Sequence, residues 1–185
     1  MSELSSNITL GAGCYWGTEK YIKRDFQKMF PNSIKSASVG FMSPFEDHKK
    51  NPSYRQVCTG ETGHVEVLNV ELNEPEKHLE ELIKFFFLFH DPTTENRQGN
   101  DVGTQYASAI FVNDPEQKKI VDKVINDLQS HLDENKSPYH GNKVMTLIHD
   151  ATEFYPAHDE HQEYLFKNPN GYCNHYMRMK EFPLN

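Results

Sequence analysis

Apolar side chains recur every three or four positions in three stretches of the chain, a spacing that places them on one face of a helix. The clearest stretch covers residues 75–90 and includes three consecutive phenylalanines. The others cover residues 18–30 and a stretch that begins at Pro115. Because apolar stripes of this kind pack against a core, we expect a helix in each stretch and assign the phenylalanines to the core. A last short helix is expected over residues 157–167.

Strand-like runs alternate with these helices. Residues 64–72 carry apolar side chains on both faces of an extended chain, which predicts a strand in the middle of a sheet. This interleaving predicts an α/β or α+β sandwich with helices packed on a mixed sheet. Further strands are expected over residues 7–10, 36–41, 105–112 and 143–149, and long polar loops over residues 42–56 and 91–103.

Length and charge limit the possible classes of protein. At 185 residues, with no change in composition along the chain, we expect a single domain over residues 1–185. The net charge of −8 disfavours contact with phosphate backbones, so no nucleic acid partner is expected. The most apolar run, residues 85–89, is too short to span a membrane. The glycine-bearing segment from about residue 168 lacks periodicity and is predicted to be a mobile tail.

Cysteine usage and the N-terminal residues bear on location. Three cysteines, at positions 14, 58 and 173, are too few for a disulfide scaffold and suit a reducing compartment. Residues 1–7 lack both the apolar core of a signal peptide and the arginines of a transit peptide. We therefore expect a cytoplasmic location.

One cysteine stands where a strand gives way to a helix. The pentapeptide Gly-Cys-Tyr-Trp-Gly that begins at Gly13 follows the strand of residues 7–10 and precedes a helical pattern. A helix N-terminus carries about half a positive charge and free N–H groups, so Cys14 is predicted to be stabilised as a nucleophilic thiolate. Tyr15 and Trp16 supply a flat apolar surface that could hold a small uncharged group against this thiol.

A glutamate lies within the most apolar strand. Glu66 shares a face with Leu68 and Val70, so burial is expected to disfavour its carboxylate and keep the group protonated as an acid. A buried ion pair, or a strand edge that faces water, remains an alternative for Glu66 on the pattern alone.

Other short segments stand out in the same order along the chain as the pentapeptide: residues 54–60, 62–67, 85–87, 90–93, 97–106 and 168–172. Together with the pentapeptide, which is similar to a Gly-Cys-Phe-Trp-Gly signature, they resemble the motifs of the A-type peptide methionine sulfoxide reductases. So many segments in register make chance agreement a poor explanation. The resemblance implies a ferredoxin-like split βαβ core with long loops, and reduction of methionine S-sulfoxide, free or in proteins.

For the site, the resemblance implies a thiol mechanism. Cys14 matches the nucleophile of the family, and Glu66 matches its general acid. Tyr54 and Tyr106 match tyrosines whose phenols hydrogen-bond the sulfoxide oxygen, a role that suits a donor that does not compete as a nucleophile. Asp101 resembles a position that orders water or polar groups at the site.

A second thiol is needed to complete the reaction. Attack would leave Cys14 as a sulfenic acid, which another thiol must reduce. Cys173 lies in the expected mobile tail, in a segment that resembles that of the family's resolving cysteine, and an intramolecular disulfide would follow. Cys58 matches a structural cysteine and is expected to pack in the interior. The resemblance implies thioredoxin as the reductant, and the chemistry requires no metal or organic cofactor.

The chain departs from the usual pattern of the family at three places. Tyr15 replaces a phenylalanine, which adds a hydroxyl to the methyl-binding cage that it forms with Trp16. Ala107 stands where an arginine is frequent, a change expected to alter contacts with a bound peptide. The tail holds one cysteine, so recycling through two C-terminal thiols is not expected.

Three other functions remain open from the residues. A Cys-dependent hydrolase or acyl transferase would pair Cys14 with a histidine base, for which His64, His90, His158 and His161 are available. His158 and His161 could instead belong to a metal site, although they lack the His-Glu-Xaa-Xaa-His spacing. A non-enzymatic interaction module would explain the acidic surface but would leave Cys14 without a purpose.

Overall fold

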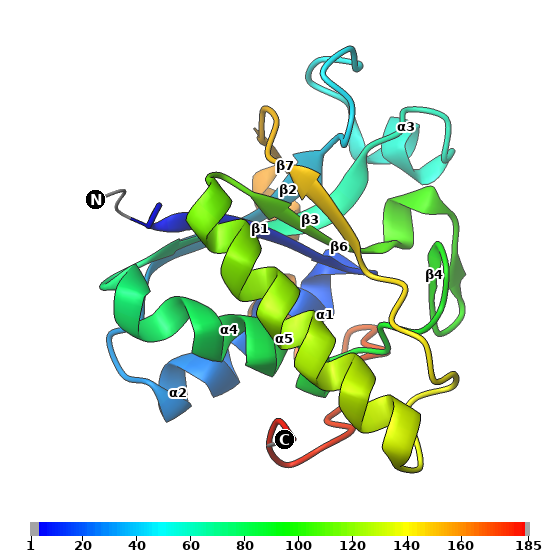
Figure 1. Ribbon diagram of the computed structural model, residues 1–185. Helices are drawn as coiled ribbons and strands as arrows, with labels where there is room; N and C mark the ends of the chain where they lie inside the picture. Colours follow the sequence, from blue (N-terminus) through cyan, green and yellow to red (C-terminus); the bar gives the residue numbers. More distant parts are fainter. Residues whose placement is uncertain (1–3, 184–185) are drawn as a thin grey trace.

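The computed structural model describes residues 4–183; the expected domain of residues 1–185 also includes 1–3 and 184–185, which lie outside the described residues. One sheet contains six strands: β1 (Asn7–Ala12), β2 (Ile34–Met42), β3 (Val65–Leu72), β6 (Ser108–Val112), β7 (Leu147–Asp150) and β8 (Tyr155–Pro156). They are ordered β7-β6-β1-β3-β2-β8 (Figure 1). A separate two-stranded ladder pairs β4 (Arg97–Gln98) with β5 (Asp101–Val102).

Helices cover one face of the sheet. The first helix, α1 (Tyr15–Lys20), continues through a π-helical turn, η1 (Tyr21–Phe26), into α2 (Gln27–Met29). The two long helices, α4 (Pro75–Phe89) and α5 (Pro115–Glu134), lie side by side in front of the sheet in Figure 1. The short helices are α3 (Tyr54–Cys58), η2 (Thr104–Tyr106), η3 (Asp159–His161) and α6 (Tyr164–Lys167). Within the described part of the chain, no helix is both long and apolar enough to cross a bilayer.

The connections confirm the expected fold class. In chain order β1, the α1–α2 segment, β2, β3, α4 and β6 form a βαββαβ unit whose strands are ordered β6-β1-β3-β2 with antiparallel neighbours. This is the ferredoxin-like split βαβ arrangement. The sheet is mixed because β7 joins β6 in parallel, whereas β8 joins β2 antiparallel.

Alternation along β3 divides its side chains between two cores. Leu68 and Val70 join the larger cluster between the sheet and the helices, whereas Val65 and Val67 join a smaller cluster on the opposite face. Successive side chains of a strand point to opposite faces, so Glu66 points toward the helix-covered side. The apolar strand therefore delivers a carboxyl group into the interior, as its pattern predicted.

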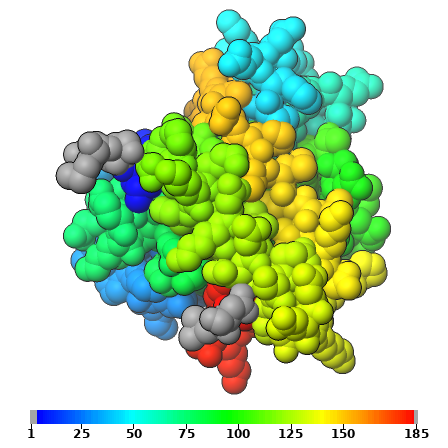
Figure 2. Space-filling model, in the orientation of Figure 1, coloured from blue at the N-terminus to red at the C-terminus, as the bar shows by residue number. Residues whose placement is uncertain are grey.

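Two differences from the predicted elements affect the site. The first helix begins at Tyr15 and not at residue 18, so the Gly-Cys-Tyr-Trp-Gly pentapeptide itself forms the first turn. The loop expected over residues 42–56 gives way to α3, because Ser53 and Gln56 form a capping box: each side chain bonds the backbone N–H of the other, at 3.1 and 3.0 Å. The rest of that loop, in cyan, projects beside the orange segment that follows β7 (Figure 2).

The later elements are shorter than predicted. The strand expected over residues 105–112 begins at Ser108, after the turn η2, and the one expected over residues 143–149 begins at Leu147. The helix predicted over residues 157–167 is wrong except for its last turn, α6. Its expected first turns run instead along the edge of β2, where the Gln162 amide bonds both the N–H and the C=O of Val39, at 2.9 and 2.8 Å.

The segment after α6 has no regular secondary structure, but its side chains pack against the domain. Phe182 joins the larger core, His175 is buried, and the backbone N–H of Arg178 donates to the carbonyl of Leu88. The mobility expected from about residue 168 stays a prediction, and any motion must break these contacts.

Candidate active site

Cys14 lies in the turn between β1 and α1. It is the N-cap of α1 and is 8% exposed. Gly13 makes the turn possible: its φ is +83°, and a Cβ there would come within 2.5 Å of Gln98 Cβ. The turn therefore holds the thiol at the helix N-terminus, with Tyr15 and Trp16 directly after it.

The protonation state of Cys14 differs from the prediction of a stabilised thiolate. Burial raises the pKa of this thiol well above its ordinary value, and the nearby Glu66 carboxylate raises it further. The backbone N–H of Trp16 lowers it, as expected at a helix N-terminus, but this is the smaller effect. Cys14 is therefore a neutral thiol in the free protein at pH 7, and it must lose its proton as it attacks.

Glu66 is buried beside this thiol. It is 1% exposed, and its Oε1 accepts the backbone N–H of Tyr15 at 3.2 Å. Its Oε2 is buried with no hydrogen-bond partner. Burial raises the pKa of Glu66 to about 8, so the group is largely a neutral acid at pH 7. The proton of this buried acid, on an oxygen without a protein partner, is available for a bound acceptor.

Two phenols complete the polar part of the site. Tyr54 comes from α3 and Tyr106 from the turn η2. Burial raises the pKa of both phenols, and the Glu66 carboxylate raises them further, so both stay protonated donors. Cys58 was expected to pack in the interior but is only partly buried. Burial raises the pKa of Cys58, while hydrogen bonding from Tyr54 and Tyr106 lowers it.

Aromatic rings pack around the two residues that follow the thiol. Tyr15 is fully buried, and its hydroxyl has no partner, so the extra oxygen is unsatisfied in the free protein. Trp16 stacks on Tyr164, with ring centroids 3.9 Å apart, and its indole N–H donates to His161 Nδ1 at 3.2 Å. The His161 ring lies 4.5 Å from that of Tyr54. The cage thus contains residues from α1, α3, η3 and α6.

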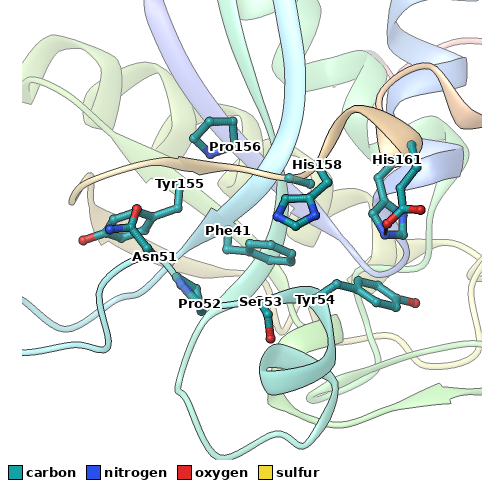
Figure 3. Close-up of a pocket in the computed structure, with 11 residues that line it drawn as sticks. Phe41, Asn51, Pro52, Ser53, Tyr54, Tyr155, Pro156, His158 and His161 are labelled. Atoms are coloured by element: carbon teal, nitrogen blue, oxygen red, sulfur yellow. Dashed lines mark ion pairs between the residues drawn. The ribbon is translucent and has the colours of Figure 1, made fainter.

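A pocket of about 140 Å³ adjoins this cage without including Cys14. Phe41, Tyr54 and His161 line it, and Figure 3 shows these three side chains among the residues around the pocket. Sequence reasoning considered His161 only as a base or a metal ligand and missed its place beside Trp16. No local pattern in the sequence signalled this position, because it depends on tertiary packing.

Asp101 and Cys173 meet at the mouth of the site. Asp101 Oδ2 accepts from the Tyr172 hydroxyl at 3.1 Å and from Asn174 Nδ2 at 3.2 Å, so it holds the two residues that flank Cys173. Burial raises the pKa of Asp101. Interaction with Cys173 is among the smaller effects that raise the pKa of Cys14. The structure therefore brings together the eight residues predicted for the site.

Three of the four histidines considered as a base already use a ring nitrogen in another hydrogen bond. The His64 ring bonds a loop carbonyl at 2.7 Å, and the buried His90 ring bonds a helix carbonyl and Ser108 Oγ. His161 Nδ1 accepts the indole N–H of Trp16. A histidine base for the thiol is therefore not favoured.

A buried thiol beside a neutral carboxylic acid and two phenols, where the central strand β1 of a ferredoxin-like sheet ends, defines a cysteine-based enzyme. Residues 6–184 match the family described as peptide methionine sulfoxide reductase. The chain belongs to this family, which makes it an oxidoreductase, as the resemblance implied.

Curated relatives span nearly the whole chain. A probable peptide methionine sulfoxide reductase of Schizosaccharomyces pombe is 41% identical over 94% of this chain and 96% of its own length. The peptide methionine sulfoxide reductase MsrA of Mycoplasma genitalium is 43% identical over 90% and 96%. Among solved structures, reduced Mxr1 from Saccharomyces cerevisiae is 39% identical, with a TM-score of 0.80 over 95% of this chain and 93% of that one. Mxr1 in complex with Trx2 is also similar, at 26% identity and a TM-score of 0.57.

Proposed function

We propose that this protein reduces methionine S-sulfoxide, free or in proteins, with Cys14 as the nucleophile. The observation that carries the proposal is the Glu66 carboxyl group, which is buried, neutral at pH 7 and unpaired at Oε2 beside the thiol. A sulfoxide becomes reactive when its oxygen gains a proton, so an acid and a soft nucleophile at one place fit this substrate.

The reaction balances with these groups alone. Glu66 protonates the sulfoxide oxygen while the Cys14 sulfur attacks the sulfoxide sulfur and passes its own proton back to Glu66. The oxygen then moves to Cys14, so that methionine leaves and Cys14 becomes a sulfenic acid. The sulfoxide sulfur gains two electrons and the cysteine sulfur loses two.

The surrounding residues orient the substrate. The phenols of Tyr54 and Tyr106 donate to the sulfoxide oxygen, a role that their raised pKa values support because they keep the protons in place. Tyr15 and Trp16 hold the methyl group in the aromatic cage. Asp101 keeps the mouth of the site in place through its bonds to the tail.

A second thiol and an external reductant complete the cycle. Cys173 condenses with the Cys14 sulfenic acid to form a disulfide and water, and a thioredoxin dithiol then reduces the disulfide. The complex of the related Mxr1 with Trx2 supports this partner. The three free cysteines support a cytoplasmic location, where thiols stay reduced.

The test is consumption of methionine S-sulfoxide, with the R epimer as control, by the wild-type protein and by Cys14→Ser and Cys173→Ser. We expect Cys14→Ser to be inactive with both dithiothreitol and thioredoxin. Cys173→Ser should lose only the thioredoxin-supported turnover, because a small dithiol can reduce a sulfenic acid directly. A wild-type protein that consumes neither epimer would refute the proposal.

A further inference from the structure

A hydrogen bond links His175, two residues after Cys173, to Ala12, two residues before Cys14. His175 is 5% exposed, and its Nε2–H donates to the carbonyl oxygen of Ala12 at 2.5 Å. Ala12 is the last residue of β1, which leads into the nucleophile turn. One side chain therefore connects the two cysteine-bearing segments.

A glycine and aromatic residues surround the His175 ring. A Cβ on Gly17 would overlap His175 Nδ1, so only glycine leaves room for the ring against α1. The ring packs on Phe89 with centroids 5.5 Å apart, and the Tyr21 hydroxyl donates to the His175 carbonyl at 3.1 Å. Nothing in the proposed chemistry uses these contacts, although they bury a polar ring in the larger core.

The residues on either side of Cys173 also make specific contacts. Asn174 Nδ2 donates to the Gln98 carbonyl at 2.8 Å and to Asp101, which also accepts from Tyr172. Cys173 is therefore held between anchored neighbours, and its own Sγ lies 3.8 Å from the carbonyl oxygen of His175. The thiol remains partly exposed.

We propose that His175 is a positioning residue that holds the tail so that the Cys173 thiol stays beside Cys14 for the second chemical step. The inference rests on the proposed function. In that step the Cys173 sulfur attacks the Cys14 sulfenic acid, the S–S bond forms, the S–O bond breaks, and the oxygen leaves as water with the thiol proton. A thiol on an anchored segment reacts faster than one on an unanchored segment, because less freedom of motion is lost when the two sulfurs meet.

His175 acts in this role through shape and a hydrogen bond rather than as a base. Burial lowers its pKa to about 4, so the ring is neutral at pH 7, and its Nδ1 faces Gly17 without a hydrogen-bond partner. The contact of Cys173 with this residue is to the backbone carbonyl, not to the ring.

The test separates the two chemical steps in a single turnover without reductant. Released methionine reports attack by Cys14, and the loss of the second thiol, titrated with a chromogenic disulfide, reports the step of Cys173. His175→Leu fills the space of the ring but has no hydrogen-bond donor, whereas His175→Gln retains an N–H that can reach the Ala12 carbonyl. We expect both variants to release methionine at the wild-type rate. The second phase should slow at least ~10-fold in His175→Leu and remain within about threefold of wild type in His175→Gln.

Two further variants keep the test decisive. Gly17→Ala adds a Cβ that displaces the imidazole ring without changing residue 175 itself. This variant should reproduce the slow second phase even if His175→Leu fails to fold. Arg178→Met loosens the tail further along, where its guanidinium bonds the Phe89 carbonyl, and should leave the second phase unchanged. A normal or faster second phase in a folded His175→Leu or Gly17→Ala variant would overturn the positioning role. Failure of the wild-type protein to release methionine would refute the proposed function instead.

Discussion

Replacing Glu66 with glutamine preserves the shape of the side chain and removes its titration. Burial raises the pKa of Glu66 from its ordinary 4.5 to about 8, a difference that corresponds to about 5 kcal/mol. This is the cost, to an order of magnitude, of ionising the group inside the folded protein. Glutamine does not ionise at any pH, so comparing the stability of the variant with that of the wild type measures the free energy of ionising Glu66.

The sign of the effect follows from proton binding. Between about pH 4.5 and pH 8 the folded protein keeps a proton on Glu66 that the unfolded chain has released. The contribution of this group to stability is therefore full below pH 4.5 and falls by about 1.4 kcal/mol per pH unit up to pH 8. The free energy of unfolding of Glu66→Gln, relative to wild type, should rise by about 5 kcal/mol over this range and then level off. Urea unfolding at half-unit pH intervals measures it.

The same variant tests the acid in catalysis. A general acid typically contributes about 10²- to 10⁴-fold, so Glu66→Gln should release methionine at least ~100-fold more slowly than wild type at pH 7 in a single turnover. The wild-type rate should fall as pH rises through about 8, where Glu66 loses its proton. The fall should be absent from the variant. Equal pH slopes of stability in the two proteins, or a fall near pH 8 that survives in Glu66→Gln, would refute the reasoning.

Other changes probe the phenols, the nucleophile turn and the edge of the sheet. Tyr54→Phe and Tyr106→Phe should each lower kcat/KM about 10- to 100-fold with dithiothreitol as reductant, the value of one hydrogen bond to a developing charge. Gly13→Ala should destabilise the protein by about 1–3 kcal/mol in urea unfolding, because alanine tolerates a φ of +83° poorly. Gln162→Leu should cost about 2 kcal/mol in the same assay, since it leaves three hydrogen bonds unmade. Lys118→Ala, which removes an exposed ion pair, should change stability by less than about 0.5 kcal/mol.

Each of these predictions has a result that would contradict it. Wild-type kcat/KM in either phenylalanine variant would show that the phenol does not donate to the sulfoxide oxygen. Wild-type stability of Gly13→Ala would mean that the turn relaxes without strain. A loss in Gln162→Leu no larger than that in Lys118→Ala would show that water replaces the amide at the strand edge.

The sequence predicted the parts of the fold where the pattern is strong and local. The apolar side chains on both faces of β3 and the apolar stripe of α4 each predicted one element, and the structure confirms both. Residues 157–163 carry no such signal. Their conformation depends on one amide, that of Gln162, meeting a strand more than a hundred residues away, which no local pattern encodes.

The parts of the site that depend on local sequence were also predictable. The pentapeptide pattern located Cys14, and the apolar neighbours of Glu66 predicted its burial. The state of the thiol was not predictable, because the helix N-terminus is visible in sequence whereas the burial that outweighs it is a tertiary property. The place of His161 beside Trp16 was likewise hidden, since it depends on how η3 packs against α1.

The contact between Gln162 and Val39 also bears on self-association. An open strand edge offers unpaired N–H and C=O groups to any extended chain, and such edges lead to aggregation. On β2 the short strand β8 covers Gly40 and Phe41, and the Gln162 side chain occupies the next backbone groups as a strand would. The strand β8 and this one amide together close the part of the edge from Val39 to Phe41 to the addition of a foreign strand.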